Sequence, residues 1–255
     1  MNSPFAWPGG KRNLVKRLLP LLPAHRIYVE PFCGSAKLLF AKKPSEREVI
    51  SDANGELINF FQVAKHRPSA LAQEFHTALC HPKMFSDLRR SRAARNEVER
   101  AFRFLYLTQF SFGAKGEHFA GHRDFAPNRR LDLISTKLTA AAERLRNVVI
   151  ECADYAEIIR KYDTPQTLFY CDPPYVDFVG NARYEPFGEE KLDALFDLLA
   201  KIKGKFLLSE ENHQEVARRV NARAFISRRM QTTYSMNARS TTLRKTELLI
   251  ANYAI

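Results

Sequence analysis

The chain has 255 residues, of which 45% are hydrophobic and 11% aromatic, so it can bury a substantial core and global disorder is excluded. Forty lysines and arginines stand against 28 aspartates and glutamates, and this net charge of +12 favours a polyanionic partner such as nucleic acid over a merely solubilising charge. Four cysteines without a CxxC pair, no apolar signal core and no run of membrane-spanning length predict a cytoplasmic protein without structural zinc.

The first part of the chain alternates strands and helices. Residues 27–33 are predicted to form a short buried strand that runs into Gly34, and residues 36–42 a helix. A second strand is expected at 48–52, followed by an amphipathic segment that reaches His66. A strand, a glycine turn, a helix and a strand that ends in an acid are typical of the start of a doubly wound α/β sheet.

The middle of the chain has a different pattern. Residues 68–112 have helical periodicity with a dense cationic part, residues 113–130 form a Gly/His/Arg/Asn-rich loop, and residues 133–146 form a helix. Strand–helix alternation is missing here. We therefore predict a helical insert at 67–146, within a domain made of residues 1–66 and 147–255.

Alternation resumes after the middle segment. Strands are expected at 148–154, 167–171 and 206–209, with helices at 155–161 and 189–203 and another that ends at Asn221. Two late strands at 224–232 and 247–253 flank a basic polar loop, which predicts an antiparallel hairpin. The predicted fold class is α/β, a doubly wound mixed sheet.

Four chemistry-bearing segments fall at predicted strand ends, where open α/β sheets bind ligands. They are residues 32–35, Asp52, Asp154 and residues 172–175. Gly34 lets a backbone approach a ligand, but a full GxGxxG and a Lys-Ser/Thr pair are missing, which argues against a nucleoside triphosphate. Asp52 stands where ribose hydroxyls are usually bound; alternatively, Asp52 or Asn54 caps the following helix.

The segment Asp172-Pro173-Pro174-Tyr175 suits chemistry on the planar amine of a nucleobase. The Asp172 carboxylate and the Pro173 carbonyl are acceptors that stabilise charge developing on an attacking nitrogen. Two prolines fix φ and so pre-set the direction of these acceptors, while Tyr175 offers a face for a base removed from its stack. The alternative is a capped turn with a core tyrosine.

The order of these motifs resembles that of the Dam-like DNA N6-adenine methyltransferases, which have a Rossmann-like methyltransferase fold. The matching stretches are FAWPGGK (5–11), VEPFCGS (29–35), SDAN (51–54), DPPY (172–175) and ELLIANY (247–253). The resemblance implies S-adenosyl-L-methionine as cofactor, DNA as substrate and Asp172 as the catalytic acid beside the methionine moiety. It also implies that residues 1–66 and 147–255 form the catalytic and cofactor-binding domain and that residues 67–146 form the target-recognition insert. The cofactor-binding residues that it implies are Trp7, Lys11, Phe32, Gly34, Asp52, Asp154, Tyr155 and Asp172.

The sequence departs from the family in two places. The family's first turn is usually F-x-G-x-G, whereas Ser35-Ala36 follows Gly34 here, so the cofactor must tolerate a Cβ. Residues 106–116 are only loosely similar to the recognition region of GATC-methylating members, so the target sequence is not carried over. Taken alone, residues 7–11 are a flexible turn with a solvated lysine, and the alternative for Asp154 is a strand-end cap.

Cationic side chains of the middle segment suit contacts to DNA, with a solvated cationic face as the alternative. His118 and His122 lack a third ligand, so no metal is predicted, and a basic loop at 239–245 is a second candidate contact. The residues predicted to bind DNA are Arg89, Arg90, Arg92, Lys115, Arg123, Arg129 and Arg130.

The expected function is methylation of adenine N6 in double-stranded DNA, with the target base flipped against Tyr175 and with no need for a metal or a nucleophilic cysteine. Another planar amine (cytosine N4, RNA adenine or a protein glutamine) and a catalytically silent DNA-binding module are the alternatives. A restriction endonuclease or mobile-element partner, the target sequence and the oligomeric state are left open.

Overall fold

The computed structural model describes the chain except residues 1, 8–13, 92–95, 121–126, 176–186 and 236–241. For residues 127–130, 132, 232–235 and 242–245 it describes the backbone but not the side chains. Among the described helices, none combines the length and the apolar composition needed to cross a membrane.

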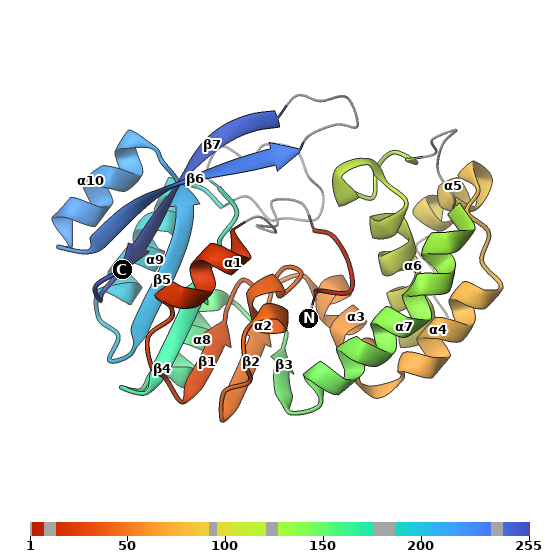
Figure 1. The fold of residues 1–255 in the computed structure, drawn as a ribbon, viewed down its shortest axis with the longest axis horizontal. Helices are drawn as coiled ribbons and strands as arrows, with labels where there is room; N and C mark the ends of the chain where they lie inside the picture. Colours follow the sequence, from red (N-terminus) through yellow and green to blue (C-terminus); the bar gives the residue numbers. More distant parts are fainter. Residues whose placement is uncertain (1, 8–13, 92–95, 121–126, 176–186, 236–241) are drawn as a thin grey trace.

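The strands form a seven-stranded mixed sheet in the order β3-β2-β1-β4-β5-β7-β6 (Figure 1). The first five strands in this order pair in parallel and β7 is antiparallel to both of its neighbours. The order turns at β1 and β4, the switch point of a doubly wound sheet, so the predicted fold class is confirmed. The strands are β1 (Ile27–Glu30), β2 (Arg47–Ser51), β3 (Val148–Glu151), β4 (Thr167–Cys171), β5 (Lys205–Glu211), β6 (Ile226–Ser235) and β7 (Thr242–Ala251).

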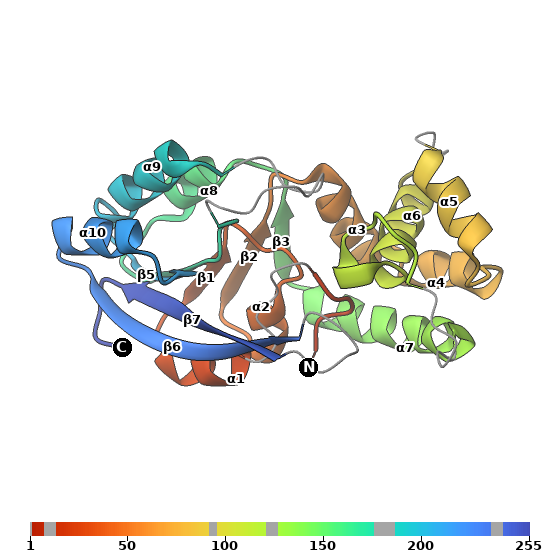
Figure 2. The same cartoon turned by 90° about the horizontal axis from the view of Figure 1, so that it is seen from above.

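Helices cover both faces of the sheet (Figure 2). One face packs against α8 (Tyr155–Tyr162), α9 (Glu189–Leu199) and α10 (Gln214–Ala222), whose apolar sides share one buried cluster with β4 and β5. The apolar spacing of α9 matches the prediction, although the helix ends at Leu199. The opposite face packs against α1 (Val15–Leu18), η1 (Leu19–Leu21), α2 (Lys37–Ala41) and α3 (Gly55–His66).

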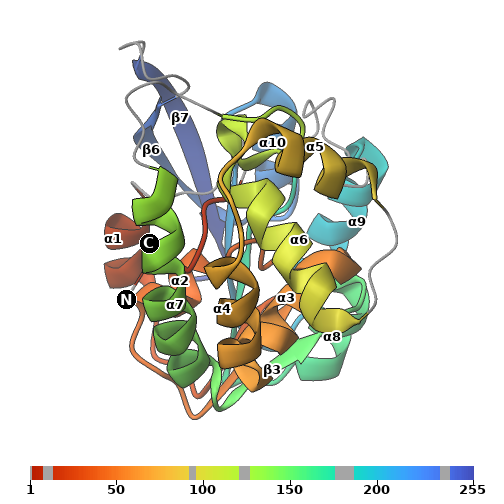
Figure 3. The same cartoon turned by 90° about the vertical axis from the view of Figure 1, so that its right-hand side faces the viewer.

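The middle of the chain is helical, as its periodicity predicts, and lies beside the β3 edge of the sheet (Figure 3). Its elements are α4 (Pro68–His76), α5 (Pro82–Arg90), α6 (Glu97–Gln109), η2 (Phe112–Ala114) and α7 (Pro127–Leu145). One apolar cluster continues from α3 into α6, where the rings of Phe60 and Phe104 lie 5.7 Å apart. Because the core is shared, the division into a catalytic domain and an insert stays a prediction.

Several boundaries differ from the predicted ones. The first strand ends at Glu30, because Pro31 has no backbone N–H to continue the ladder. The helix predicted from residue 133 begins at Pro127, a residue favoured in the first helical turn. The hairpin strands extend into polar sequence, from Ile226↔Ala251 to Ser235↔Thr242, because each strand satisfies the backbone of the other without an apolar pattern.

Candidate active site

The four predicted segments all follow the carboxyl ends of neighbouring parallel strands. Val29 of β1 pairs with Val49 of β2 and with Phe169 of β4, and Ser51 of β2 pairs with Glu151 of β3. Residues 32–35, Asp52, Asp154 and residues 172–175 are therefore brought to one edge of the sheet, across the switch point. The roles predicted for them remain predictions.

The turn after β1 is closed by a hydrogen bond between strands. Gly34 has φ +45°, and its backbone N–H donates to Oδ2 of Asp52 at 3.1 Å. A Cβ at Gly34 would lie 2.8 Å from Cδ1 of Trp7, a distance that real Cβ contacts do not show. The left-handed backbone favours glycine here, and the approach of the indole leaves no room for a Cβ.

The family's second glycine position is occupied by Ala36, which is fully buried and has φ +50°. A left-handed alanine costs roughly 1 kcal/mol, so the turn keeps the backbone shape of a glycine turn despite its Cβ.

Asp52 is a half-buried carboxylate with acceptor capacity to spare. Its Oδ1 accepts from the N–H of Asn54 at 3.0 Å, while Asn54 itself caps α3 by accepting from Glu56 and Leu57 at 3.1 Å each. Asn54, rather than Asp52, is therefore the helix cap. Burial raises the pKa of Asp52, and the hydrogen bonds from Asn54 and Gly34 oppose that shift.

Three aromatic rings form a cluster beside this edge. Phe32 stacks on Tyr155 with centroids 5.0 Å apart and 25° between the planes, and Phe187 meets both rings edge-on at 5.6 and 5.8 Å. The sequence reasoning missed Phe187, which no motif marks. Asp154 is exposed and caps α8 through the N–H of Ala156 at 2.8 Å, so a capping role is present.

Trp7 is a buried side chain that ties the amino-terminal segment to the helices. Its ring packs against Phe5 and Phe104, with centroid distances of 5.9 and 5.7 Å, and it covers Gly34. Lys11, the second residue assigned to the cofactor from this motif, lies outside the described residues.

Glu30 is a buried carboxyl that the sequence reasoning did not select. Its Oε1 accepts from the Tyr28 hydroxyl at 2.8 Å and from the Leu39 N–H, in the first turns of α2, at 2.7 Å. Burial raises the pKa of Glu30 to about 7, and the charge of Asp172 acts in the same direction. A glutamate in an otherwise apolar strand is the signal that marks it.

The DPPY segment leaves a fully buried strand. Asp172 is half-buried and Pro173 is buried, while Tyr175 is partly exposed and its hydroxyl lies 2.7 Å from both carboxylate oxygens of Glu247. Tyr175 is therefore not a plain core residue. Burial raises the pKa of the Cys171 thiol far above its usual range, which agrees with the packing role predicted for it.

A cavity of about 670 Å³ lies between α5 and the segment that follows η2. Arg89 and Arg90 are exposed in the last turn of α5 and line it together with His118, and the rings of Phe85 and Phe119 hold the two walls together at 5.5 Å. Lys115 is exposed and precedes His118 by three residues in the chain. Arg92 and Arg123 lie outside the described residues, as do the side chains of Arg129 and Arg130.

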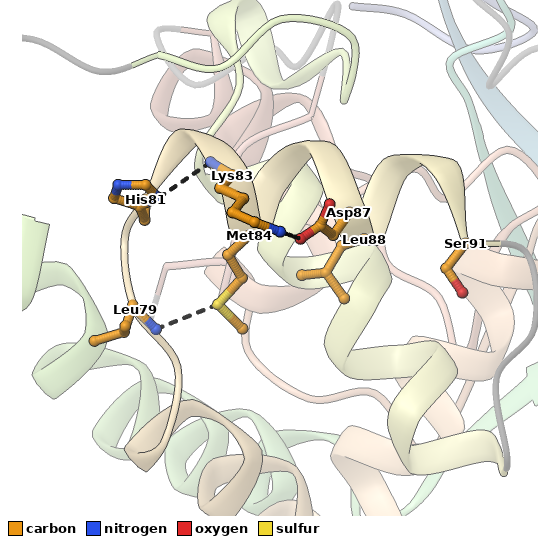
Figure 4. A pocket seen from close by; sticks show the side chains of 7 residues that line it. All are labelled: Leu79, His81, Lys83, Met84, Asp87, Leu88 and Ser91. Carbon is orange, nitrogen blue, oxygen red and sulfur yellow. Dashed lines mark hydrogen bonds and ion pairs between the residues drawn. The ribbon is translucent and has the colours of Figure 1, made fainter.

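A second cavity, of about 390 Å³, also borders α5 (Figure 4). Apolar side chains of Leu79, Met84 and Leu88 line it, next to an exposed ion pair between Lys83 and Asp87 at 2.8 Å. It contains none of the predicted site residues. Within the described part of the chain, no group of three or more His, Cys, Asp or Glu side chains is arranged to hold a metal ion.

Comparison with known proteins assigns a family. The D12 class N6 adenine-specific DNA methyltransferase model matches residues 7–236. A DNA adenine methylase of Vibrio cholerae is 27% identical over 196 residues, which cover 71% of this chain and 68% of that protein. The type II methyltransferase M1.LlaDCHI of Lactococcus lactis is 27% identical over an alignment of 273 residues, covering 98% and 95%. The DNA adenine methylase of Escherichia coli is 24% identical over 192 residues, covering 71% and 67%. Because the family match spans most of the chain, this protein belongs to the D12 class N6 adenine-specific DNA methyltransferases.

Proposed function

We propose that the protein transfers a methyl group from S-adenosylmethionine to N6 of adenine in double-stranded DNA. The observation that carries this proposal is the convergence of Asp172 and Tyr175 with Gly34 and Asp52 at one edge of the sheet, across the β1–β4 switch point. Ligands of open α/β sheets bind at such an edge.

The residues at this edge fit the cofactor. Asp52 accepts one described hydrogen bond at each oxygen, and a carboxylate can accept more, so it is suited to the ribose hydroxyls. The stacked rings of Phe32 and Tyr155 provide an apolar border for the adenine. The left-handed turn at Gly34 allows a backbone to approach the ligand closely. Trp7, Lys11 and Asp154 are assigned to the cofactor by the family resemblance.

When bound, S-adenosylmethionine supplies the sulfonium methyl group that the target nitrogen accepts. The residues of this chain act on the target amine. The Asp172 carboxylate and the Pro173 carbonyl accept hydrogen bonds from its two N–H groups and stabilise the positive charge that develops on nitrogen. The methylated nitrogen then loses one proton, which leaves a neutral secondary amine. Buried Pro173 and the fixed φ of both prolines hold these acceptors in place beforehand, which lowers the entropic cost of assembly.

The duplex is held by the helical segment 67–146 while the target adenine is flipped against Tyr175. Exposed Arg89 and Arg90, and Lys115, provide phosphate contacts that position the DNA. Arg92, Arg123, Arg129 and Arg130 are assigned the same role from their sequence alone.

Substitution of the catalytic acid tests the proposal. We expect Asp172→Ala to abolish methyl transfer while the protein retains substantial affinity for DNA. Asp197→Ala is the matched control, because Asp197 is an exposed acid on α9 that bonds Arg223, and it should keep wild-type activity. Plasmid DNA is incubated with methyl-labelled cofactor, digested to nucleosides and separated, so that the labelled base is identified directly.

Three outcomes would contradict this proposal. Full activity of Asp172→Ala would remove the catalytic role of the acid. Label on cytosine, or on RNA or protein instead of DNA, would point to a different planar amine. The absence of detectable cofactor binding to the wild type in calorimetry would favour a catalytically silent DNA-binding module.

A further inference from the structure

A contact joins the DPPY segment to a distant strand. The hydroxyl of Tyr175 lies 2.7 Å from Oε1 and 2.7 Å from Oε2 of Glu247, which is 72 residues later in the chain. Tyr175 follows β4, Glu247 belongs to β7, and β5 lies between these strands in the sheet. The tyrosine side chain therefore reaches past one strand to bind a carboxylate on the next.

Glu247 is only 1% exposed, although it is an acid. The described groups around it come from both neighbouring strands: Ser209 of β5 donates its hydroxyl to Oε2 at 3.2 Å, and Glu211 of β5 and Met230 of β6 are its strand partners. Burying a carboxylate is costly unless hydrogen bonds compensate it. Hydrogen bonds from the Tyr175 and Ser209 hydroxyls supply part of this compensation.

Anchoring the hydroxyl restrains the aromatic ring. A partly exposed tyrosine normally samples more than one rotamer, whereas a bond at the far end of the side chain fixes both the position of the ring and the direction of its face. Catalytic sites that depend on orientation require such restraint before the substrate arrives. The described contacts supply this restraint to Tyr175 from the hairpin strand.

We propose that Glu247 is a positioning residue for the methylated base: through the Tyr175 hydroxyl it holds the ring against which the flipped adenine lies. This inference rests on the proposed function, because it takes the target base to stack on Tyr175. Glu247 does not touch the substrate. Its effect is to keep the stacking face aligned with the acceptors of Asp172 and Pro173.

Methyl transfer to unmethylated plasmid DNA tests this role without knowledge of the target sequence. Tyr175→Phe keeps the ring and removes the hydroxyl, and Glu247→Ala removes the carboxylate. Because a hydrogen bond to a charged group is lost in each case, we expect each variant to lower kcat by roughly ten-fold or more, with a smaller change in KM for DNA. Glu247→Gln keeps an oxygen that accepts a hydrogen bond from the Tyr175 hydroxyl, so its kcat should lie close to that of the wild type.

A double variant identifies the shared interaction. If Glu247 acts through Tyr175, the variant carrying both Tyr175→Phe and Glu247→Ala should be no slower than the slower single variant. Tyr253→Phe is the matched control, because it also removes a tyrosine hydroxyl that donates a hydrogen bond. The acceptor in this case is the carbonyl of Leu21 on η1, at 3.0 Å. The Tyr253→Phe variant should retain wild-type kcat.

The outcomes separate this inference from the proposed function. A wild type that fails to methylate adenine contradicts the function itself. If the wild type is active, a Tyr175→Phe variant within about two-fold of its kcat overturns the positioning role, as do losses that multiply in the double variant. Tyr175→Phe leaves β7 intact, so it decides the question even if Glu247→Ala does not fold.

Discussion

Two buried glutamates on neighbouring strands meet opposite electrostatic environments. Glu48 on β2 accepts hydrogen bonds from Lys42 at 2.6 Å and from the guanidinium of Arg144; although burial alone would raise the pKa of Glu48, these two cations hold it below its ordinary value. Glu30 on β1 accepts from the neutral Tyr28 hydroxyl and a backbone amide, so burial raises its pKa to about 7.

The difference shows that burial of an acid does not by itself mark a functional residue. Glu48 lies away from the carboxyl edge and anchors α7, because Arg144 belongs to that helix and also donates to the Leu39 carbonyl at 2.8 Å. Glu30 ends β1 at the candidate site, where the charge of Asp172 disfavours its ionised form. Direct hydrogen bonds from two cations lower the pKa of Glu48, whereas the donors to Glu30 are neutral and burial raises its pKa.

Removal of a cation from beside Glu48 should change the free energy of unfolding more than the other substitutions considered below. In Arg144→Met, a buried carboxylate loses one of its two compensating charges, and we expect the free energy of unfolding to fall by about 3 kcal/mol or more. Urea denaturation at pH 7 measures it. The matched control is Arg26→Met, which breaks an exposed pair with Glu46 at 2.7 Å and should cost less than about 1 kcal/mol. Equal losses in the two variants would show that burial of the Glu48 group is energetically irrelevant.

The sequence predicted the parts of the molecule that local patterns encode. Apolar runs and helical periodicity located the sheet and the helical middle, and acids at strand ends located Asp52 and Asp172. The Glu48–Arg144 ion pair was not predicted, because its two residues are 96 positions apart and each alone resembles a solvated charge. The contact between Tyr175 and Glu247 was missed for the same reason, because the two residues are 72 positions apart. Phe187 joins the aromatic cluster only through the folded arrangement of β1, β3 and the segment before α9.

Neutralisation of Glu30 should produce the next largest change in the free energy of unfolding, and this change should depend on pH. The folded pKa of about 7 exceeds the ordinary value of 4.5, so the folded protein binds the proton more tightly than the unfolded chain. Wild-type stability from this group is therefore complete below pH 4.5 and is lost as the pH rises to about 7. Glu30→Gln keeps an acceptor for Tyr28 and Leu39 without the titration.

The difference between wild type and Glu30→Gln isolates this contribution. We expect the variant to gain on the order of 3 kcal/mol relative to the wild type between pH 4.5 and pH 8, measured by urea denaturation across that range. Titrations of all other groups are shared by the two proteins and largely cancel. A difference that does not change with pH would mean that Glu30 ionises at its ordinary pKa.

The smallest effect concerns the single hydroxyl that partly compensates Glu30. Tyr28→Phe removes the hydrogen bond to Oε1 and keeps the ring that lies 4.4 Å from the Lys42 ammonium. Because the Tyr28 hydroxyl stabilises the ionised carboxyl, its loss should raise the pKa of Glu30 further and cost about 1 kcal/mol more at pH 8 than at pH 5. Urea denaturation of both proteins at the two pH values measures this. Tyr106→Phe is the control: its hydroxyl donates to the Leu79 carbonyl at 2.6 Å, which does not titrate, so its cost should be the same at both pH values. If the two variants respond to pH in the same way, the Tyr28 hydroxyl does not distinguish the charge states of Glu30, and the pKa of Glu30 is set without it.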